Sequence, residues 1–171
     1  SSREGLQGKV SEILGKADDK AILEQAIIKD FNLPTEYSKK ALEQCEYIGD
    51  AIKPEDREGR LDLTNQTIFT IDGADARDLD DAVSIKKFDD GTYERGVHIA
   101  DVGNYVTLGS PLDEEAFERG TSVYFPDNVI PMLPKKLSNG ICSLNPNVER
   151  LALSVIMRID STGKVISHEI K

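Results

Sequence analysis

The sequence predicts an α+β protein with a mainly antiparallel or mixed sheet and flanking helices. Two strand-like runs, residues 82–88 and 93–102, flank the turn-forming tetrapeptide at residues 89–92, which is typical of a hairpin. Residues 110–119 start with a serine cap, a proline and an acidic residue, the signature of a helix start. A chain of 171 residues with 39% hydrophobic side chains suits one domain with a core.

The first third of the chain predicts a strand and then a helix. Residues 6–14 alternate imperfectly between apolar and polar and end at Gly15, which indicates a single strand with no partner nearby. Asp18 or Asp19 can cap a helix that continues to about Asp30. Its apolar residues fall on one face at helical spacing: Ile22, Leu23, Ala26, Ile27 and Phe31.

A second helix and an exposed connection precede the main body. Thr35 is a candidate cap for a helix that reaches about Ile48 and stops at Gly49. Residues 54–60 are charged and lack periodicity, so we place the main boundary of the chain there.

The remainder is rich in extended segments. Residues 67–71 are β-branched or aromatic, predict a strand and lead directly into Asp72. Residues 121–134 alternate but contain three prolines, so they are extended without forming a central strand throughout. Residues 151–159 predict a buried strand, which a turn joins to a partner at residues 164–170.

Composition restricts the classes of function. A net charge of −10 and a pI near 4.7 argue against strong electrostatic binding of nucleic acid by this chain alone. Cys45 and Cys142 lie far apart and outside any CxxC pattern, so buried reduced thiols are expected and not a zinc site. Neither a membrane-length apolar run nor a signal peptide is visible, and a cytoplasmic protein without membrane partners is expected.

An acidic loop follows the strand at residues 67–71. It places five aspartates within ten positions: Asp72, Asp75, Asp78, Asp80 and Asp81. Ionised carboxylates this close repel one another unless a metal ion, backbone N–H groups or a shared proton offsets the repulsion. The loop therefore indicates a cation site.

Carboxylate ligands favour hard divalent ions, Mg²⁺, Mn²⁺ or Ca²⁺. The calcium loop of an EF-hand does not fit, because Ala74 and Ala82 occupy positions where it needs acidic or amide ligands. Magnesium with open positions suits phosphoryl transfer, since phosphate oxygens complete its shell. Three readings follow from the residues alone: metal-dependent phosphoester cleavage, a structural cation site, or a hydrogen-bonded acidic turn.

Several motifs, in order and spacing, resemble the ribonuclease II and ribonuclease R family over residues 59–171. They are Thr70-Ile71-Asp72-Gly73-x-Asp75-Ala76-Arg77-Asp78-x-Asp80-Asp81-Ala82, Ile99-Ala100-Asp101-Val102, Gly120-Thr121-Ser122-Val123-Tyr124-Phe125-Pro126, Ile130-Pro131-Met132-Leu133-Pro134 and Leu137-Ser138-x-x-x-Cys142-Ser143-Leu144-Asn145-Pro146. The resemblance implies a magnesium-dependent processive 3′→5′ exoribonuclease that hydrolyses RNA to nucleoside 5′-monophosphates, with Mn²⁺ as a substitute ion. Its partner would be the 3′ end of single-stranded RNA.

The resemblance also implies roles for individual residues. Four aspartates fall on the family's active-site carboxylates: Asp72 and Asp81 as the firmest metal ligands, Asp80 as the least replaceable catalytic residue, and Asp78 beside the second metal or the terminal ribose. Tyr124 matches an aromatic residue that stacks on a base, or it is simply a half-buried tyrosine. Asp101 is a candidate for supporting the metal ligands from outside, or an ordinary strand-end acid.

For His98 and Arg150 the sequence leaves more than one role open. His98 lies in the predicted third strand, where a histidine with satisfied hydrogen bonds is the more common case. Arg150 could meet phosphate or pair with an acid.

The match covers only part of the family's catalytic domain. We therefore expect an incomplete exoribonuclease domain: residues 1–15 as the tail of a preceding cold-shock-like β-barrel, residues 16–58 as a helical connector, and residues 59–171 as the N-terminal part of the catalytic domain. The isolated fragment is expected to be inactive and to self-associate through exposed edges. The alternatives are a magnesium-dependent phosphohydrolase of small substrates and a non-catalytic, cation-stabilised interaction module.

Overall fold

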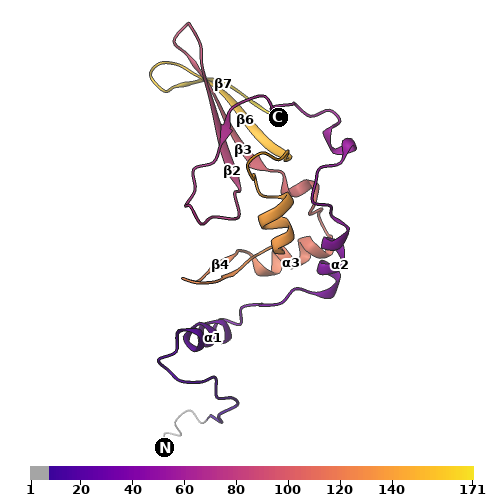
Figure 1. Ribbon diagram of the computed structural model, residues 1–171, viewed down its shortest axis with the longest axis vertical. Helices are drawn as coiled ribbons and strands as arrows, with labels where there is room; N and C mark the ends of the chain where they lie inside the picture. The colour runs from indigo at the N-terminus through magenta and orange to yellow at the C-terminus, as the bar shows by residue number, and fades with distance from the viewer. Residues whose placement is uncertain (1–7) are drawn as a thin grey trace, which may run out of the picture.

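The computed structural model describes residues 8–171, and three parts follow one another along its long axis (Figure 1). Helix α1 lies near the N-terminal end, a group of helices occupies the middle, and a sheet forms the far end (Figure 1). The helical elements are α1 (Lys20–Asp30), α2 (Lys39–Tyr47), η1 (Pro54–Arg57), η2 (Val102–Asn104), α3 (Pro111–Arg119) and the π-helical turn η3 (Leu137–Ile141). No helix in this range is long and apolar enough to cross a membrane.

The sheet has five strands in the order β1-β2-β3-β6-β7, and every neighbouring pair is antiparallel. Its strands are β1 (Ile68–Phe69), β2 (Asp81–Lys87), β3 (Tyr93–Ala100), β6 (Ala152–Ile159) and β7 (Val165–Ile170). The predicted hairpins β2–β3 and β6–β7 are confirmed. The chain leaves the sheet between β3 and β6 to form α3, η3 and a separate ribbon of β4 (Val123–Tyr124) and β5 (Val129–Ile130).

The two faces of the sheet differ in an unexpected way. On one face the buried positions are small or polar: Ala82, Ser84, Gly96, His98, Ala100 and Ser154. The opposite face carries an aliphatic and aromatic row across all five strands: Phe69, Val83, Val97, Val155 and Ile170. On this second face Ile99 is 46% and Leu153 is 56% exposed. The larger apolar side chains of the sheet therefore stay open to solvent.

The main apolar core lies among the helices and not on the sheet. It consists of Ala41, Cys45, Leu112, Leu133, Leu137, Ile141 and Cys142. Both cysteines are buried and unpaired, as predicted. Arg119 of α3 joins the segment between α1 and α2 to this core. Its guanidinium donates to Glu115 and to the carbonyls of Pro34 and Glu36, and it stacks on Tyr37.

Two predictions for the N-terminal third are wrong. The described part of the predicted strand, residues 8–14, is not a strand, because the described chain offers it no hydrogen-bonding partner; its first two residues lie outside the described range. The second helix starts at α2 with Ser38 as its cap, since the Ser38 hydroxyl accepts from the Ala41 N–H, and Thr35 lies outside it. Asp19 caps α1 as predicted, yet the predicted apolar face of α1 buries no residue.

Other predicted elements are present but shorter or less buried. The strand expected over residues 67–71 is only β1, and the residues that follow it already belong to the acidic loop. Strand β6 is only partly buried, because one of its faces belongs to the open side of the sheet. Helix α3 has the predicted bounds and ends at Gly120, whose φ of 72° suits glycine.

Candidate metal-binding and catalytic site

The acidic loop connects β1 to β2, so it leaves and enters the sheet at neighbouring antiparallel strands. Asp72, Asp80 and Asp81 are exposed and Asp78 is half-buried. Asp81 is the first residue of β2 and pairs with Ile99 on β3. The sheet thus fixes the end of the loop that carries three of the four predicted carboxylates.

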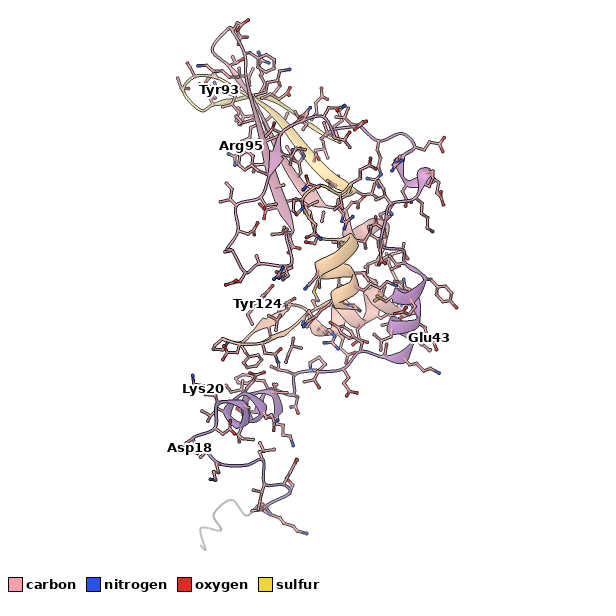
Figure 2. The ribbon with its side chains drawn as sticks, in the orientation of Figure 1. Asp18, Lys20, Glu43, Tyr93, Arg95 and Tyr124 are labelled. Atoms are coloured by element: carbon pink, nitrogen blue, oxygen red, sulfur yellow. The ribbon has the colours of Figure 1, made fainter. Side chains whose placement is uncertain are left out.

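Tyr124 contacts the acidic loop from a different part of the chain. Figure 2 shows it between the β4–β5 ribbon and the loop, and its hydroxyl donates to Asp78 Oδ2 at 2.5 Å. The bond to Asp78, and next burial, raise the pKa of Tyr124 above its usual value. The side chain is 63% exposed, so a half-buried tyrosine is the wrong description and its ring is accessible beside the carboxylates.

The four carboxylates influence one another electrostatically. Partial burial, followed by the negative charges of Asp78, Asp81 and Asp72, raises the pKa of Asp80. Solvent that still reaches Asp80 screens part of this repulsion. Ionisation of Asp80 is therefore disfavoured by its neighbours, and a bound cation would relieve that repulsion.

The carboxylate oxygens of the four aspartates are suitable ligands for a hard divalent cation, but their positions do not enclose one. Oxygen ligands and accumulated negative charge suit Mg²⁺ or Mn²⁺, and within residues 8–171 none of the four carboxylates forms an ion pair with a basic side chain. Over the same range, however, no three His, Cys, Asp or Glu side chains form a group that could hold a metal ion. The ligands are thus gathered into one loop without being closed around a common point.

Backbone contacts hold the second half of the loop. Ser143 Oγ accepts from the Leu79 N–H at 3.0 Å and donates to the Arg77 carbonyl at 3.0 Å. The Leu144 N–H donates to the Leu79 carbonyl at 2.8 Å, and the Ala100 N–H donates to the Asp80 carbonyl at 2.9 Å. Sequence patterns gave no local signal for Ser143, because its partners lie more than sixty positions away.

Asp101 does not reach the acidic loop through its side chain. Its carboxylate accepts from Arg60 at 2.7 Å, and the same guanidinium group contacts Asn104 at 3.3 Å. The contact joins the segment that enters the sheet region to the end of β3. This geometry gives Asp101 the strand-end role and leaves it without a contact to the predicted metal ligands.

His98 is a satisfied structural histidine, as predicted. It is 2% exposed, its Nε2 lies 3.0 Å from Ser84 Oγ and its Nδ1 lies 2.8 Å from Ser154 Oγ. Burial lowers its pKa, which keeps the ring neutral at pH 7. Gly96 makes room for this cluster, since a Cβ there would lie 2.3 Å from Ser84 Oγ.

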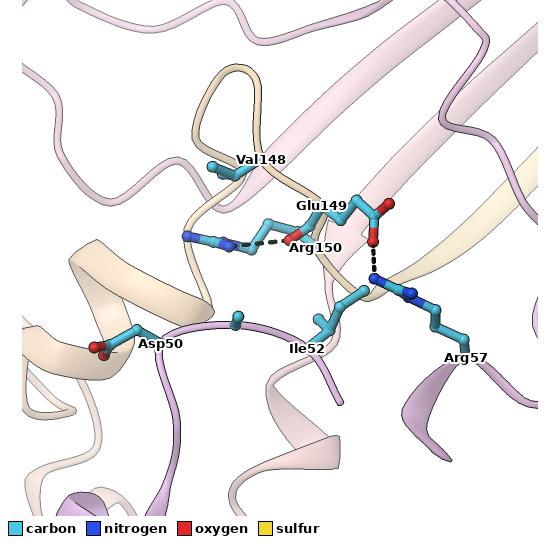
Figure 3. Close-up of a pocket in the computed structure, with 7 residues that line it drawn as sticks. Asp50, Ile52, Arg57, Val148, Glu149 and Arg150 are labelled. Atoms are coloured by element: carbon cyan, nitrogen blue, oxygen red, sulfur yellow. Dashed lines mark hydrogen bonds and ion pairs between the residues drawn. The ribbon is translucent and has the colours of Figure 1, made fainter. Parts of the chain in front are cut away.

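An open pocket of about 290 Å³ lies away from the acidic loop (Figure 3). Its lining residues are Asp50, Ala51, Ile52, Arg57, Val148, Glu149 and Arg150. Arg57 pairs with Glu149 across it at 2.5 Å, and Arg150 donates to the backbone carbonyls of Gly140, Ser143 and Glu149. Among residues 8–171 Arg150 therefore pairs with no acid, and it supports the segment around Ser143 instead.

Comparison with known proteins defines the family of this fold. Residues 60–171 match the RNB domain family, and the chain belongs to that family. Within it, the chain is similar to ribonuclease R. It is 52% identical over 165 residues to Ribonuclease R 1 of Lactococcus lactis subsp. lactis, a match that covers 96% of this chain and 20% of that protein.

Solved structures agree with this assignment of the fold. The chain resembles Mycoplasma genitalium RNase R in complex with double-stranded RNA with a TM-score of 0.86 and 31% identity, over 94% of this chain and 28% of that one. It also resembles yeast Ssd1, described as a pseudonuclease, with a TM-score of 0.74 and 26% identity, over 92% of this chain and 20% of that one. The chain spans about a fifth to a quarter of its curated relatives.

Proposed function

We propose that this chain is the N-terminal part of the catalytic domain of a cytoplasmic, magnesium-dependent, processive 3′→5′ exoribonuclease that releases nucleoside 5′-monophosphates. Residues 59–171 would belong to that domain, residues 16–58 would connect it to a preceding β-barrel, and residues 1–15 would be the tail of that barrel. The observation that carries the proposal is the convergence of Asp78, Asp80 and Tyr124 at the end of the sheet in an RNB-family fold.

In the proposed reaction, Asp72 and Asp81 hold the divalent cation. Asp80 is the carboxylate whose loss lowers catalysis most. Asp78 supports a second cation or the terminal ribose. When bound, Mg²⁺ or Mn²⁺ supplies activation of the attacking water and stabilisation of the leaving oxygen. Residues of the rest of the polypeptide would complete the site, because the four carboxylates alone do not enclose an ion.

Tyr124 is proposed to stack on a base near the 3′ end of single-stranded RNA. Stacking does not depend on sequence, because every base presents a π-face. The accessible ring and its hydroxyl contact with Asp78 support this role, since a stacked base would lie beside the carboxylates. The net charge of −10 implies that the basic surface for the phosphate backbone lies elsewhere in the longer protein.

A non-catalytic RNA-binding module is the second candidate, favoured by the similarity to a protein described as a pseudonuclease. The two candidates differ in whether the carboxylates perform chemistry. A phosphohydrolase of small substrates is less well supported, because the carboxylates lie in an open loop and not in a closed pocket.

Degradation of a 3′-end single-stranded RNA by the longer polypeptide, with Mg²⁺, separates these candidates. Asp80→Asn should lower kcat by about 10³-fold or more, because it removes a charge that acts in the reaction. Asp75→Asn is the matched control, because it removes a charge from the same loop outside the four carboxylates. Equal degradation by wild type and Asp80→Asn would reject the catalytic assignment.

A further inference from the structure

Ser143 occupies an unusual place for a serine, because it is completely buried yet bound to a loop that is open to solvent. Its exposed fraction is 0%, and it follows η3, whose Leu137 and Ile141 belong to the helical core. Its hydroxyl spans two residues of the acidic loop, accepting from the Leu79 N–H and donating to the Arg77 carbonyl, both at 3.0 Å. One side chain thus connects the rigid core to the acidic loop.

The contacts of Ser143 surround Asp78. Arg77 and Leu79, the residues on either side of Asp78, are both bound by the Ser143 hydroxyl. The Leu144 N–H fixes the Leu79 carbonyl, so both polar backbone groups of Leu79 are held by two consecutive residues. Fixing the backbone around Asp78 limits where its carboxylate can lie.

The backbone of Ser143 is itself fixed from two sides. Its N–H donates to the Gly140 carbonyl at 3.1 Å, and its carbonyl accepts from Arg150 Nε at 3.0 Å. Arg150 Nε also contacts the Gly140 carbonyl at 3.2 Å, which ties the end of η3 to the same guanidinium. Because Ser143 cannot shift without breaking these bonds, it is a firm anchor for the loop.

We propose that Ser143 is a positioning residue, which acts through the backbone of Arg77 and Leu79 to hold the carboxylate of Asp78 beside the cation site. Its hydroxyl does not touch the ion. By fixing the loop backbone, it limits how far the four repelling carboxylates can move apart. This role rests on the proposed function, in which these carboxylates bind a divalent cation.

The test compares Ser143→Ala with Ser143→Thr and Ser154→Ala in this chain. Ser143→Thr keeps the hydroxyl. Ser154→Ala is the matched control, because Ser154 is also buried, at 3% exposure, and hydrogen-bonded, but to His98 and not to the acidic loop. Both alanine variants should lower Tm, since each leaves a buried partner without its hydrogen bond.

Two measurements follow the variants: amide hydrogen exchange at Leu79, and the Mn²⁺ concentration that half-broadens the NMR signals of the acidic loop. Ser143→Ala should speed exchange at Leu79 and weaken Mn²⁺ binding by roughly 10–100-fold, the usual effect of losing a residue that orients metal ligands. Ser143→Thr should restore both properties at least in part, and Ser154→Ala should change neither.

The outcomes are distinguishable. Mn²⁺ binding by Ser143→Ala within twofold of wild type, or an equal loss in Ser154→Ala, would overturn the positioning role while leaving the cation site intact. Absence of Mn²⁺ broadening in wild type at millimolar concentration, together with absence of Mn²⁺ binding by the longer polypeptide, would instead overturn the cation site of the proposed function, and with it the positioning role.

Discussion

At the scale of single residues, the acidic loop concentrates negative charge around Asp80. Partial burial, and then the carboxylates of Asp78, Asp81 and Asp72, disfavour ionisation of Asp80, and no basic side chain within residues 8–171 pairs with these carboxylates. Residues that destabilise a fold in this way are typical of functional sites. Removing one of these charges should therefore stabilise the folded chain and, in the longer polypeptide, lower activity.

Asp80→Asn should raise the free energy of unfolding of the cation-free chain at pH 7 by roughly 0.2–1 kcal/mol, and its Tm with it, because solvent screens the repulsion. The sign follows from linkage: a raised pKa in the folded state stabilises it at low pH, and this contribution is lost as pH rises through the raised pKa. The difference between the variants should shrink below about pH 4, where the unfolded carboxyl is protonated. Thermal unfolding from pH 3.5 to 7 measures this, and a lower Tm for Asp80→Asn at pH 7 would contradict it.

Residue identity and the family resemblance nominated the residues of this candidate site, whose metal and catalytic roles stay predictions, and missed the contacts that support them. Five aspartates in a short loop indicate a cation on physical grounds, and the downstream motifs single out four of them and Tyr124. The Ser143 contacts and the Arg60–Asp101 pair are long-range, so no local pattern reports them. Arg150 was expected to meet phosphate or pair with an acid; its guanidinium instead donates to three backbone carbonyls, and a contact with phosphate stays a prediction.

At the scale of elements, local signals predicted most helices and strands, and tertiary contacts decided the exceptions. Helix α3 has cap, proline and terminal glycine in agreement, so its bounds follow from sequence. Residues 8–14 have strand-like alternation but no partner strand in the described chain. Turn η3 was missed, because its π-helical bonds and the core packing of Leu137 and Ile141 follow from the surrounding fold.

The connector between α1 and α2 should depend on Arg119. Its side chain is 3% exposed, and Arg119→Met would leave Glu115 and two carbonyls without their donor. Loss of one member of a buried ion pair costs about 3–5 kcal/mol. Lys39→Met is the matched control, because the Lys39–Glu43 pair is exposed and its loss costs about 0.5 kcal/mol or less. Urea unfolding measures both, and similar losses for the two variants would contradict the buried role of Arg119.

At the scale of the whole molecule, the sheet is the incomplete part. Its buried face is small and polar, whereas the row from Phe69 to Ile170 crosses the open face. The sequence could not indicate which face of the sheet is covered, because apolar residues alternate along the strands and occur on both faces. The family relatives are about four to five times longer, which is consistent with further chain packing against this sheet in those proteins.

The isolated chain should therefore self-associate through the open face of the sheet. Leu153→Lys, on that face opposite Ile99, should weaken the dimer by at least about tenfold, because burying an unpaired lysine costs more than about 1.4 kcal/mol. Leu108→Lys is the control, since Leu108 is 96% exposed and lies outside the sheet. Sedimentation velocity over a concentration series measures both; an unchanged Leu153→Lys dimer would point to the strand edges instead, and a monomer at every concentration would refute self-association.

The most direct test of a catalytic cation site in the acidic loop is anomalous diffraction from crystals of the protein soaked in Mn²⁺. The expected result is one or two peaks about 2.1 Å from carboxylate oxygens of Asp72 or Asp81, with Asp78 and Asp80 beside them. The same peak should be absent from crystals of Asp72→Asn and Asp81→Asn together. Saturating Mn²⁺ with no peak at any of the four carboxylates would contradict a cation site in this loop.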